Sequence, residues 1–191
     1  MKKKILLLLA LSLSLSLVLF GCGGSSKEIV EVKTPEEAAK MEGDPIQNLA
    51  LKEKQWLSQL DVVRSEISKS YDDWEQGKIS KEDFLGQLNK SKETIKPLIK
   101  DYDLHMEVNA FPEDSKNEEI YKDGLAYGDK LRAIVNNFIF MATEGIMDSQ
   151  TNKLKPLTDD QIKDVYKKYM VERYDEYKAK LSPALENAAK K

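Results

Sequence analysis

The chain has 191 residues, of which 41% are hydrophobic and 33% are charged, so it is long enough for one ordinary domain with a buried core. Its 33 acidic and 30 basic residues give a net charge of −3, which argues against a nucleic acid as the partner. Because there is a single cysteine, no internal disulfide can form and the fold must depend on packing.

The first 22 residues have the order of an export signal. Lys2, Lys3 and Lys4 precede an apolar stretch over residues 5–20 that is rich in Leu and Ser, and the small Gly21 stands directly before Cys22. This order, ending in Leu19-Phe20-Gly21-Cys22, resembles the signal peptide and lipobox of bacterial lipoproteins. The resemblance implies that the Cys22 sulfur carries a diacylglyceryl group and that the chain is cut between Gly21 and Cys22. It also implies that the new N-terminus can be acylated, for example with palmitate.

The alternative for residues 5–20 is a transmembrane anchor. The uncharged stretch is about 17 residues long, at the lower end of the spanning range, and Gly23-Gly24-Ser25-Ser26 follows it instead of a charged stop-transfer segment. We therefore expect a protein held to the membrane through the lipid on Cys22. Two fatty chains hold a protein stably, whereas one holds it only marginally. The expected location is the outer face of the cytoplasmic membrane, or an outer membrane if the source has one.

Three regions follow from this interpretation: the signal peptide over residues 1–21, a lipidated N-terminus and flexible tether over 22–45, and a helical domain over 46–191. The mature chain has 27 basic and 33 acidic residues once the three signal lysines are removed, which gives a net charge of −6. Electrostatic docking on anionic lipid is therefore not expected. Within the tether, which is rich in Gly, Ser, Lys, Glu, Thr and Pro, Thr34-Pro35 could start a short helix.

From residue 46 onward the apolar residues recur at helical spacing, mostly three or four positions apart. The first helix is expected to reach about residue 76, because Gly77 is a natural helix stop. The second starts at Ser80, with Asp83 completing a capping box. Pro97 lies inside this second run and should kink or split it.

The third helix is expected over about residues 116–150, and its second half, residues 134–147, is the most apolar part of the mature chain. The fourth helix starts at Thr158 and should end or bend at Ser182-Pro183. No segment reads as a strand. The sequence thus predicts an all-α fold, an antiparallel up-down four-helix bundle with long helices that comes after the tether.

His105 is the only histidine, and the sequence places it in a connector between helices. A metal site or a general base needs partners, and neither a second histidine nor a free cysteine exists in the mature chain. A loop or partly buried histidine is therefore the favoured interpretation.

The two helix–loop–helix junctions partly resemble EF-hand calcium loops. Trp74 stands where the first loop needs a carboxylate, and Lys153 stands where the second needs its turn glycine. Each loop has two carboxylates at ligand positions, whereas calcium needs several hard oxygens. We therefore predict no metal site. The candidate ligands that such a site would use are Asp72, Asp83, Asp148, Asn152 and Asp159.

Two further patterns have an ordinary packing interpretation beside a functional one. Gly124 and Gly128 have the G-x-x-x-G spacing that allows close helix contact, and here indicate a tightly packed helix start. The fourth helix has tyrosines at 166, 169, 174 and 177, a stripe that is more typical of core than of a groove for a peptide or partner helix.

No catalytic constellation is visible: there is no nucleophile elbow, no phosphate loop and no CxxC pair. We therefore expect a non-enzymatic binding or structural module at the cell envelope, with an envelope protein as partner and without a cofactor. The alternative is a small-ligand or metal-binding lipoprotein that uses a tyrosine-lined pocket or the two loops.

Overall fold

The computed structural model describes residues 34–190. The signal peptide, the lipobox with Gly21 and Cys22, and the first part of the tether lie outside the described residues. The described residues are mostly helical, as the sequence predicted. None of the helices within them has the length and apolar character needed to cross a bilayer.

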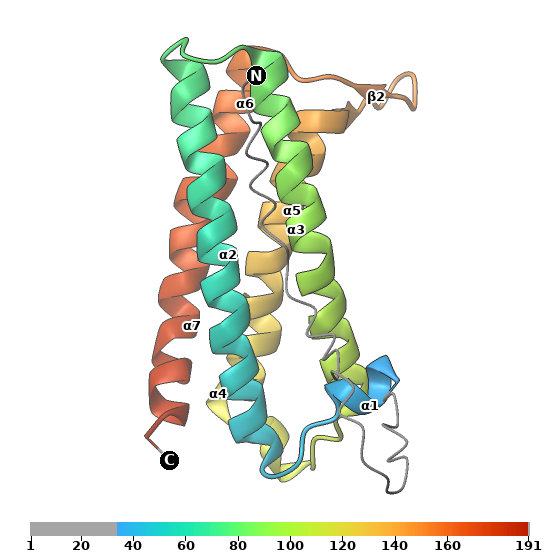
Figure 1. Cartoon of the computed structure of the whole chain (residues 1–191), viewed down its shortest axis with the longest axis vertical. Helices are drawn as coiled ribbons and strands as arrows, with labels where there is room; N and C mark the ends of the chain where they lie inside the picture. The colour runs from blue at the N-terminus through green and yellow to red at the C-terminus, as the bar shows by residue number, and fades with distance from the viewer. Residues whose placement is uncertain (1–33, 191) are drawn as a thin grey trace, which may run out of the picture. The chain divides into compact units, whose positions relative to one another are not determined.

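Long helical runs make up most of this part of the chain (Figure 1). The first two are uninterrupted, α2 over Pro45–Glu75 and α3 over Lys81–Val108. The third run consists of α4 (Glu119–Asp123), the π-helical stretch η2 (Gly124–Gly128) and α5 (Asp129–Glu144). The fourth consists of α6 (Asp159–Tyr166), the π-helical stretch η3 (Lys167–Arg173) and α7 (Tyr174–Ala188).

The runs pack side by side around a shared apolar core. α2 packs against α3 and α7, and α5 packs against the same two helices. The core is formed by apolar side chains from every run. Among its largest fully buried members are Trp56, Leu60, Phe84, Leu88, Ile95, Leu131, Phe138, Ile139 and Tyr174.

Side-chain caps fix where the helices begin. The Ser80 hydroxyl accepts a hydrogen bond from the Asp83 backbone N–H, and the Asp83 carboxylate accepts one from the Ser80 N–H, which is the predicted capping box. Thr158 and Gln161 form the equivalent box at the start of α6. Gly77 ends the first run in the left-handed region at φ +70°, which an L side chain adopts at a cost.

Neither internal proline splits or ends its helix. α3 runs continuously through Pro97, and α7 continues through Pro183 to Ala188, so the split and the end, each one of two predicted alternatives, are wrong. A proline removes one backbone donor, but the buried residues on both sides of each proline hold the helix against the core. These are Ile95 and Leu98 around Pro97, and Leu181 and Ala184 around Pro183.

The third helix ends six residues earlier than predicted, at Glu144, because Gly145 has φ +98°. After it, β1 (Ile146–Met147) pairs antiparallel with β2 (Leu154–Lys155), so that Ile146 lies opposite Lys155. Strands of two residues are too short to produce an alternating pattern, which is why the sequence did not predict them. A short 3₁₀ turn, η1 (Asp114–Asn117), precedes α4.

The helix predicted to start at Thr34 is present as α1 (Pro35–Ala39), with a capping box between Thr34 and Glu37. It packs on α3, and the side chain of Asn109 fastens it there. The Met41 N–H donates to Asn109 Oδ1 at 3.0 Å, and Asn109 Nδ2 donates to the Ala39 carbonyl at 3.2 Å. The folded body therefore begins before residue 46, where the composition placed its start.

Candidate functional site

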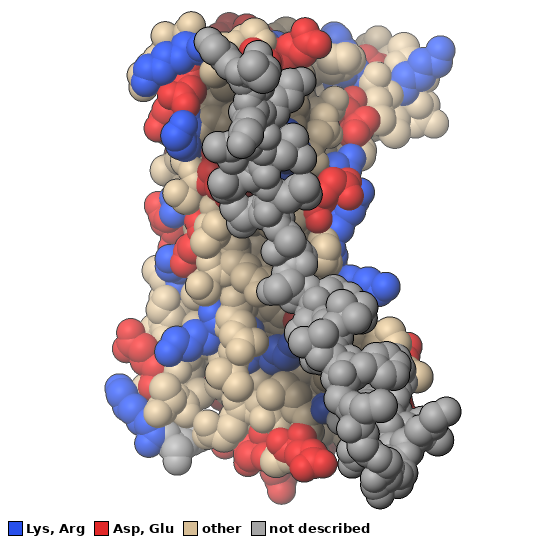
Figure 2. Space-filling view, in the orientation of Figure 1, with Lys and Arg blue, Asp and Glu red and all other residues tan. Residues whose placement is uncertain are grey.

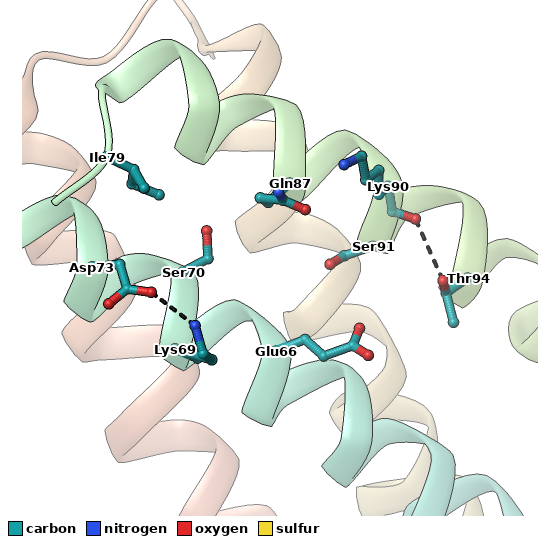
Figure 3. Close-up of a pocket in the computed structure, with 9 residues that line it drawn as sticks. All are labelled: Glu66, Lys69, Ser70, Asp73, Ile79, Gln87, Lys90, Ser91 and Thr94. Carbon is teal, nitrogen blue, oxygen red and sulfur yellow. Dashed lines mark hydrogen bonds and ion pairs between the residues drawn. The ribbon is translucent and has the colours of Figure 1, made fainter. Parts of the chain in front are cut away.

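A groove of about 530 Å³ lies between α2 and α3, and Figure 3 shows the side chains that line it. Each helix contributes one polar stripe at the spacing i, i+3, i+4, i+7, the positions that share one face of a helix. Ile79, in the connection between the helices, closes one end. The stripe on α2 is Glu66, Lys69, Ser70 and Asp73, and the stripe on α3 is Gln87, Lys90, Ser91 and Thr94.

The groove exists because a serine stands at the centre of each stripe, where a helix interface usually has a large apolar side chain. Ser70 is 8% exposed and Ser91 is 6% exposed, so both lie at the floor. The Ser70 hydroxyl points into the gap and has no hydrogen-bond partner among the described residues. A buried hydroxyl without a partner costs about 1–3 kcal/mol, so this position is not optimised for folding alone.

The charges of the groove divide into paired and unpaired groups. Lys69 Nζ lies 2.9 Å from Asp73 Oδ2, and Lys78 lies 3.4 Å from the other oxygen of Asp73. The hydrogen bond from Lys69 is the largest cause that lowers the pKa of Asp73. By contrast, the side chains of Glu66, Gln87 and Lys90 form no hydrogen bond or ion pair with any described residue.

The groove therefore holds a carboxylate, an ammonium group, an amide and hydroxyls that the fold does not use. Such groups hold a polar ligand by hydrogen bonds and charge pairing. The volume lies within the range of about 300–1,000 Å³ that is usual for small-molecule pockets. None of the fourth-run tyrosines and none of the candidate calcium ligands lines it.

The candidate calcium ligands are instead occupied with turns and caps. Asp83 caps α3, Asp148 accepts hydrogen bonds from the N–H groups of Gln150 and Thr151, and Asp159 pairs with Lys81 at 2.7 Å. Asp72 is exposed, and Asn152 has φ +54° in the hairpin turn. Within residues 34–190 no three metal-ligating side chains come together as a site.

His105 lies in the last turn of α3 and is fully buried, so its predicted place in a connector is wrong. Its ring packs edge-on against Trp56 with 5.5 Å between ring centroids, and Nδ1 lies 3.2 Å from Asn109 Nδ2. Nε2 has no hydrogen-bond partner among the described atoms. Burial is the largest cause that lowers the pKa of His105, and Lys52 lowers it further, while Asp101 opposes the shift.

A second polar feature lies beside His105, inside the core. Arg132 on α5 donates two hydrogen bonds to the carboxylate of Glu53 on α2, at 3.1 and 3.3 Å, and the two side chains are only 2% and 1% exposed. The guanidinium carbon lies 3.6 Å from the ring centroid of Tyr102. Burial raises the pKa of Glu53, and the pairing with Arg132 opposes this shift. Burial also raises the pKa of Tyr102 to about 12.

The two glycines of the G-x-x-x-G pattern make room for this ion pair. A Cβ at Gly124 would lie 3.3 Å from Oε1 of Glu53, and a Cβ at Gly128 would lie closer still to the Glu53 carboxylate. The pattern does mark tight packing, but the neighbour is a buried carboxylate. Both glycines fall in the π-helical stretch η2.

The tyrosine stripe lies mostly in the core, as predicted. Tyr166 and Tyr174 are buried, and Tyr166 stacks on Tyr71 with 3.6 Å between ring centroids. The Tyr174 hydroxyl donates to Asp61 at 3.1 Å, and Asp61 also pairs with Lys178. Tyr169 and Tyr177 are half-buried.

Sequence reasoning followed the apolar residues and so missed both polar features. The sequence contains the two polar stripes of identical spacing, each with Lys-Ser at its centre, but each stripe alone also fits a solvated helix face. Glu53 would have been visible as one charge inside an apolar stripe, since it lies between Leu49 and Trp56 at steps of four and three. Comparison of the chain with known protein families, with curated protein sequences and with solved structures found no match.

Proposed function

We propose that this chain is a lipid-anchored binding module of the bacterial cell envelope, and that the groove between α2 and α3 is its ligand site. The observation that carries the proposal is the set of polar groove side chains without a protein partner, above all the buried Ser70 hydroxyl. The order of residues up to Cys22 supports export and lipid attachment.

The fold that presents the groove is an antiparallel up-down bundle of four long helical runs. Short connections favour this arrangement, because residues 76–80 join α2 to α3 and the β hairpin joins α5 to α6. The pairwise packing of α2, α3, α5 and α7 is also what such a bundle requires.

The attachment of α1 limits how far the body can stand from its anchor. Thr34 is twelve residue steps after Cys22, and twelve steps reach at most about 40 Å at roughly 3.3 Å per residue. α1 lies at the end of the body opposite to the α2–α3 connection (Figure 1). Because Glu66 is about 30 Å along α2 from Pro45, at about 1.5 Å per residue, the groove would lie about that far above the α1 end when the body stands on that end.

The location belongs to the same proposal: the outer face of the cytoplasmic membrane, or an outer membrane where the source has one. The ligand is an envelope component, either a protein segment or a small polar molecule. Figure 2 shows one face of the protein, and Lys and Arg are intermixed with Asp and Glu over the part of it that is not grey. That mixture, together with the net acidic charge, disfavours a nucleic acid.

The anchor is tested by Cys22→Ser in cells of the source bacterium. We expect an unlipidated precursor that is no longer held tightly by the membrane fraction, with the helical domain still folded by circular dichroism. The same acylated mass in this variant would contradict the lipid attachment.

The groove is tested by placing a photo-crosslinking amino acid at residue 87 of the full-length lipoprotein in intact cells. The matched control carries it at Gln59, which is exposed on α2 and does not line the groove. We expect a discrete adduct from position 87 and none from position 59. No adduct from position 87, or the same adduct from both positions, would contradict a ligand site in the groove.

A further inference from the structure

The charges that the groove leaves unpaired have opposite sign and lie on opposite walls. Of the groove carboxylates, Asp73 is engaged by Lys69 and Lys78, which leaves Glu66 on α2. Of the groove lysines, Lys69 is engaged by Asp73, which leaves Lys90 on α3. A ligand that carried only one charge would leave one of these two groups without a partner. A ligand with one positive and one negative group matches both.

The remaining groove side chains suit the amide groups of a peptide. Gln87 offers both a donor and an acceptor, and the hydroxyls of Ser70 and Ser91 each offer the same. These three groups lie on both walls between the loop end and the Glu66 end (Figure 3). Ile79 gives that loop end an apolar surface that suits a small aliphatic side chain.

The length of the groove limits the size of the ligand. The α3 stripe extends from Gln87 to Thr94, which is about 10 Å at roughly 1.5 Å per residue. An extended peptide covers that length with about three residues, at roughly 3.3 Å each. A rim of charged side chains also favours a polar ligand over an apolar one.

We propose that the groove between α2 and α3 binds a short zwitterionic peptide, with its free amino group paired with Glu66 and its free carboxylate paired with Lys90. This inference rests on the proposed function of the groove and names the chemical class of its ligand. The amides of the bound peptide bond with Gln87 and Ser91, and with the otherwise unpartnered Ser70 hydroxyl once that side chain turns from its buried position towards the ligand.

The test is titration of the purified full-length lipoprotein in detergent with trialanine, measured by isothermal titration calorimetry. Two blocked probes, N-acetyl-trialanine and trialanine amide, remove the positive and the negative charge in turn. We expect trialanine to bind and each blocked probe to bind at least about tenfold more weakly, which corresponds to about 1.4 kcal/mol.

Two variants test which side chain of the groove pairs with each charged group of the peptide. Glu66→Gln should weaken trialanine about tenfold while removing most of the penalty for N-acetylation. Lys90→Gln should likewise weaken trialanine binding about tenfold and remove most of the penalty for amidation. Lys54→Gln, an exposed α2 position outside the groove, is the control that should bind as the parent does. Both groove side chains lack partners in the fold, so neither variant should lower the melting temperature.

Absence of trialanine binding, or equal binding of all three probes, would overturn the inference. If position 87 still gives a discrete adduct in cells, the groove remains a ligand site and only the peptide assignment fails. If position 87 gives no adduct and trialanine does not bind, the proposed function fails as well.

Discussion

The carboxylate of Glu53 occupies the space that a side chain at Gly128 would need. A Cβ built on Gly128 would lie 2.6 Å from Oε2 and 2.8 Å from Oε1 of Glu53, both far inside normal contact distance. Because Glu53 is held by two hydrogen bonds from Arg132, it cannot move aside without breaking a buried ion pair. Three residues on three separate helical elements are thereby fixed together.

Gly128→Ala is therefore expected to destabilise the fold by about 1–3 kcal/mol, the usual cost of overpacking a core. The matched control is Gly86→Ala on an exposed face of α3, where a Cβ would meet nothing within 4 Å. That change should instead stabilise by about 0.5–1 kcal/mol, because alanine loses less conformational entropy in a helix. Urea unfolding measures both. A Gly128→Ala variant as stable as the parent would contradict the placement of Glu53.

The Glu53–Arg132 pair should depend on both partners being present. Glu53→Met or Arg132→Met leaves one buried charge without its partner, and each is expected to cost about 3–5 kcal/mol. The double variant removes both charges and should be less destabilised than either single variant. The check is a double-mutant cycle by chemical denaturation. Additive losses would show that the two side chains do not interact.

The buried His105 predicts a loss of stability in mild acid. Its pKa is lowered in the folded protein, so the unfolded chain binds the proton more readily, near its ordinary value of about 6.5. The stabilisation is present above about pH 6.5 and is lost as the pH falls towards the folded-state pKa. The free energy of unfolding should therefore fall between about pH 7.5 and about pH 5.5 more steeply in the parent than in His105→Gln. Parallel pH profiles for the two proteins would contradict this expectation.

Asn109 should control the attachment of α1, and its Nδ2 also lies 2.9 Å from the carbonyl oxygen and 3.2 Å from Nδ1 of the buried His105. Its side chain donates to the Ala39 carbonyl and accepts from the Met41 N–H. Asn109→Ala is expected to increase amide hydrogen exchange over residues 35–42 while the exchange of α5 stays unchanged. Asn89→Ala, an exposed position on α3 that forms no hydrogen bond through its side chain with any described residue, is the matched control. Equal exchange in the two variants would show that α1 is held by other contacts.

The parts of the fold that obey local rules could be predicted from the sequence. The starts of α3 and α6 could be read from Ser80 and Thr158, because a capping box needs only residues three positions apart. The sequence left open whether Pro97 and Pro183 bend or interrupt their helices, and both helices continue because packing on both sides outweighs the loss of one donor. The residues next to each proline in the sequence do not show which helices will pack against them.

The partners of these polar side chains could not be predicted for a related reason. Glu53 and Arg132 are 79 positions apart, and the pairing of one with the other depends on how α2 and α5 are placed. The groove likewise depends on two stripes meeting across a helix interface. Each stripe alone is indistinguishable from a solvated helix face, so only the packed structure brings Glu66 and Lys90 to one site.

The π-helical stretches η2 and η3 are places where the helical runs could lose one residue. A π-helical turn holds one residue more than an α-helical turn, so removing one residue there can restore a regular helix without rotating the rest of the run. The same deletion inside α2 would rotate every later side chain by about 100° and turn Arg64 and Ile67 away from their contacts. Gly124–Gly128 and Lys167–Arg173 are thus the positions at which related chains can lose a residue and keep both faces of the helix in register.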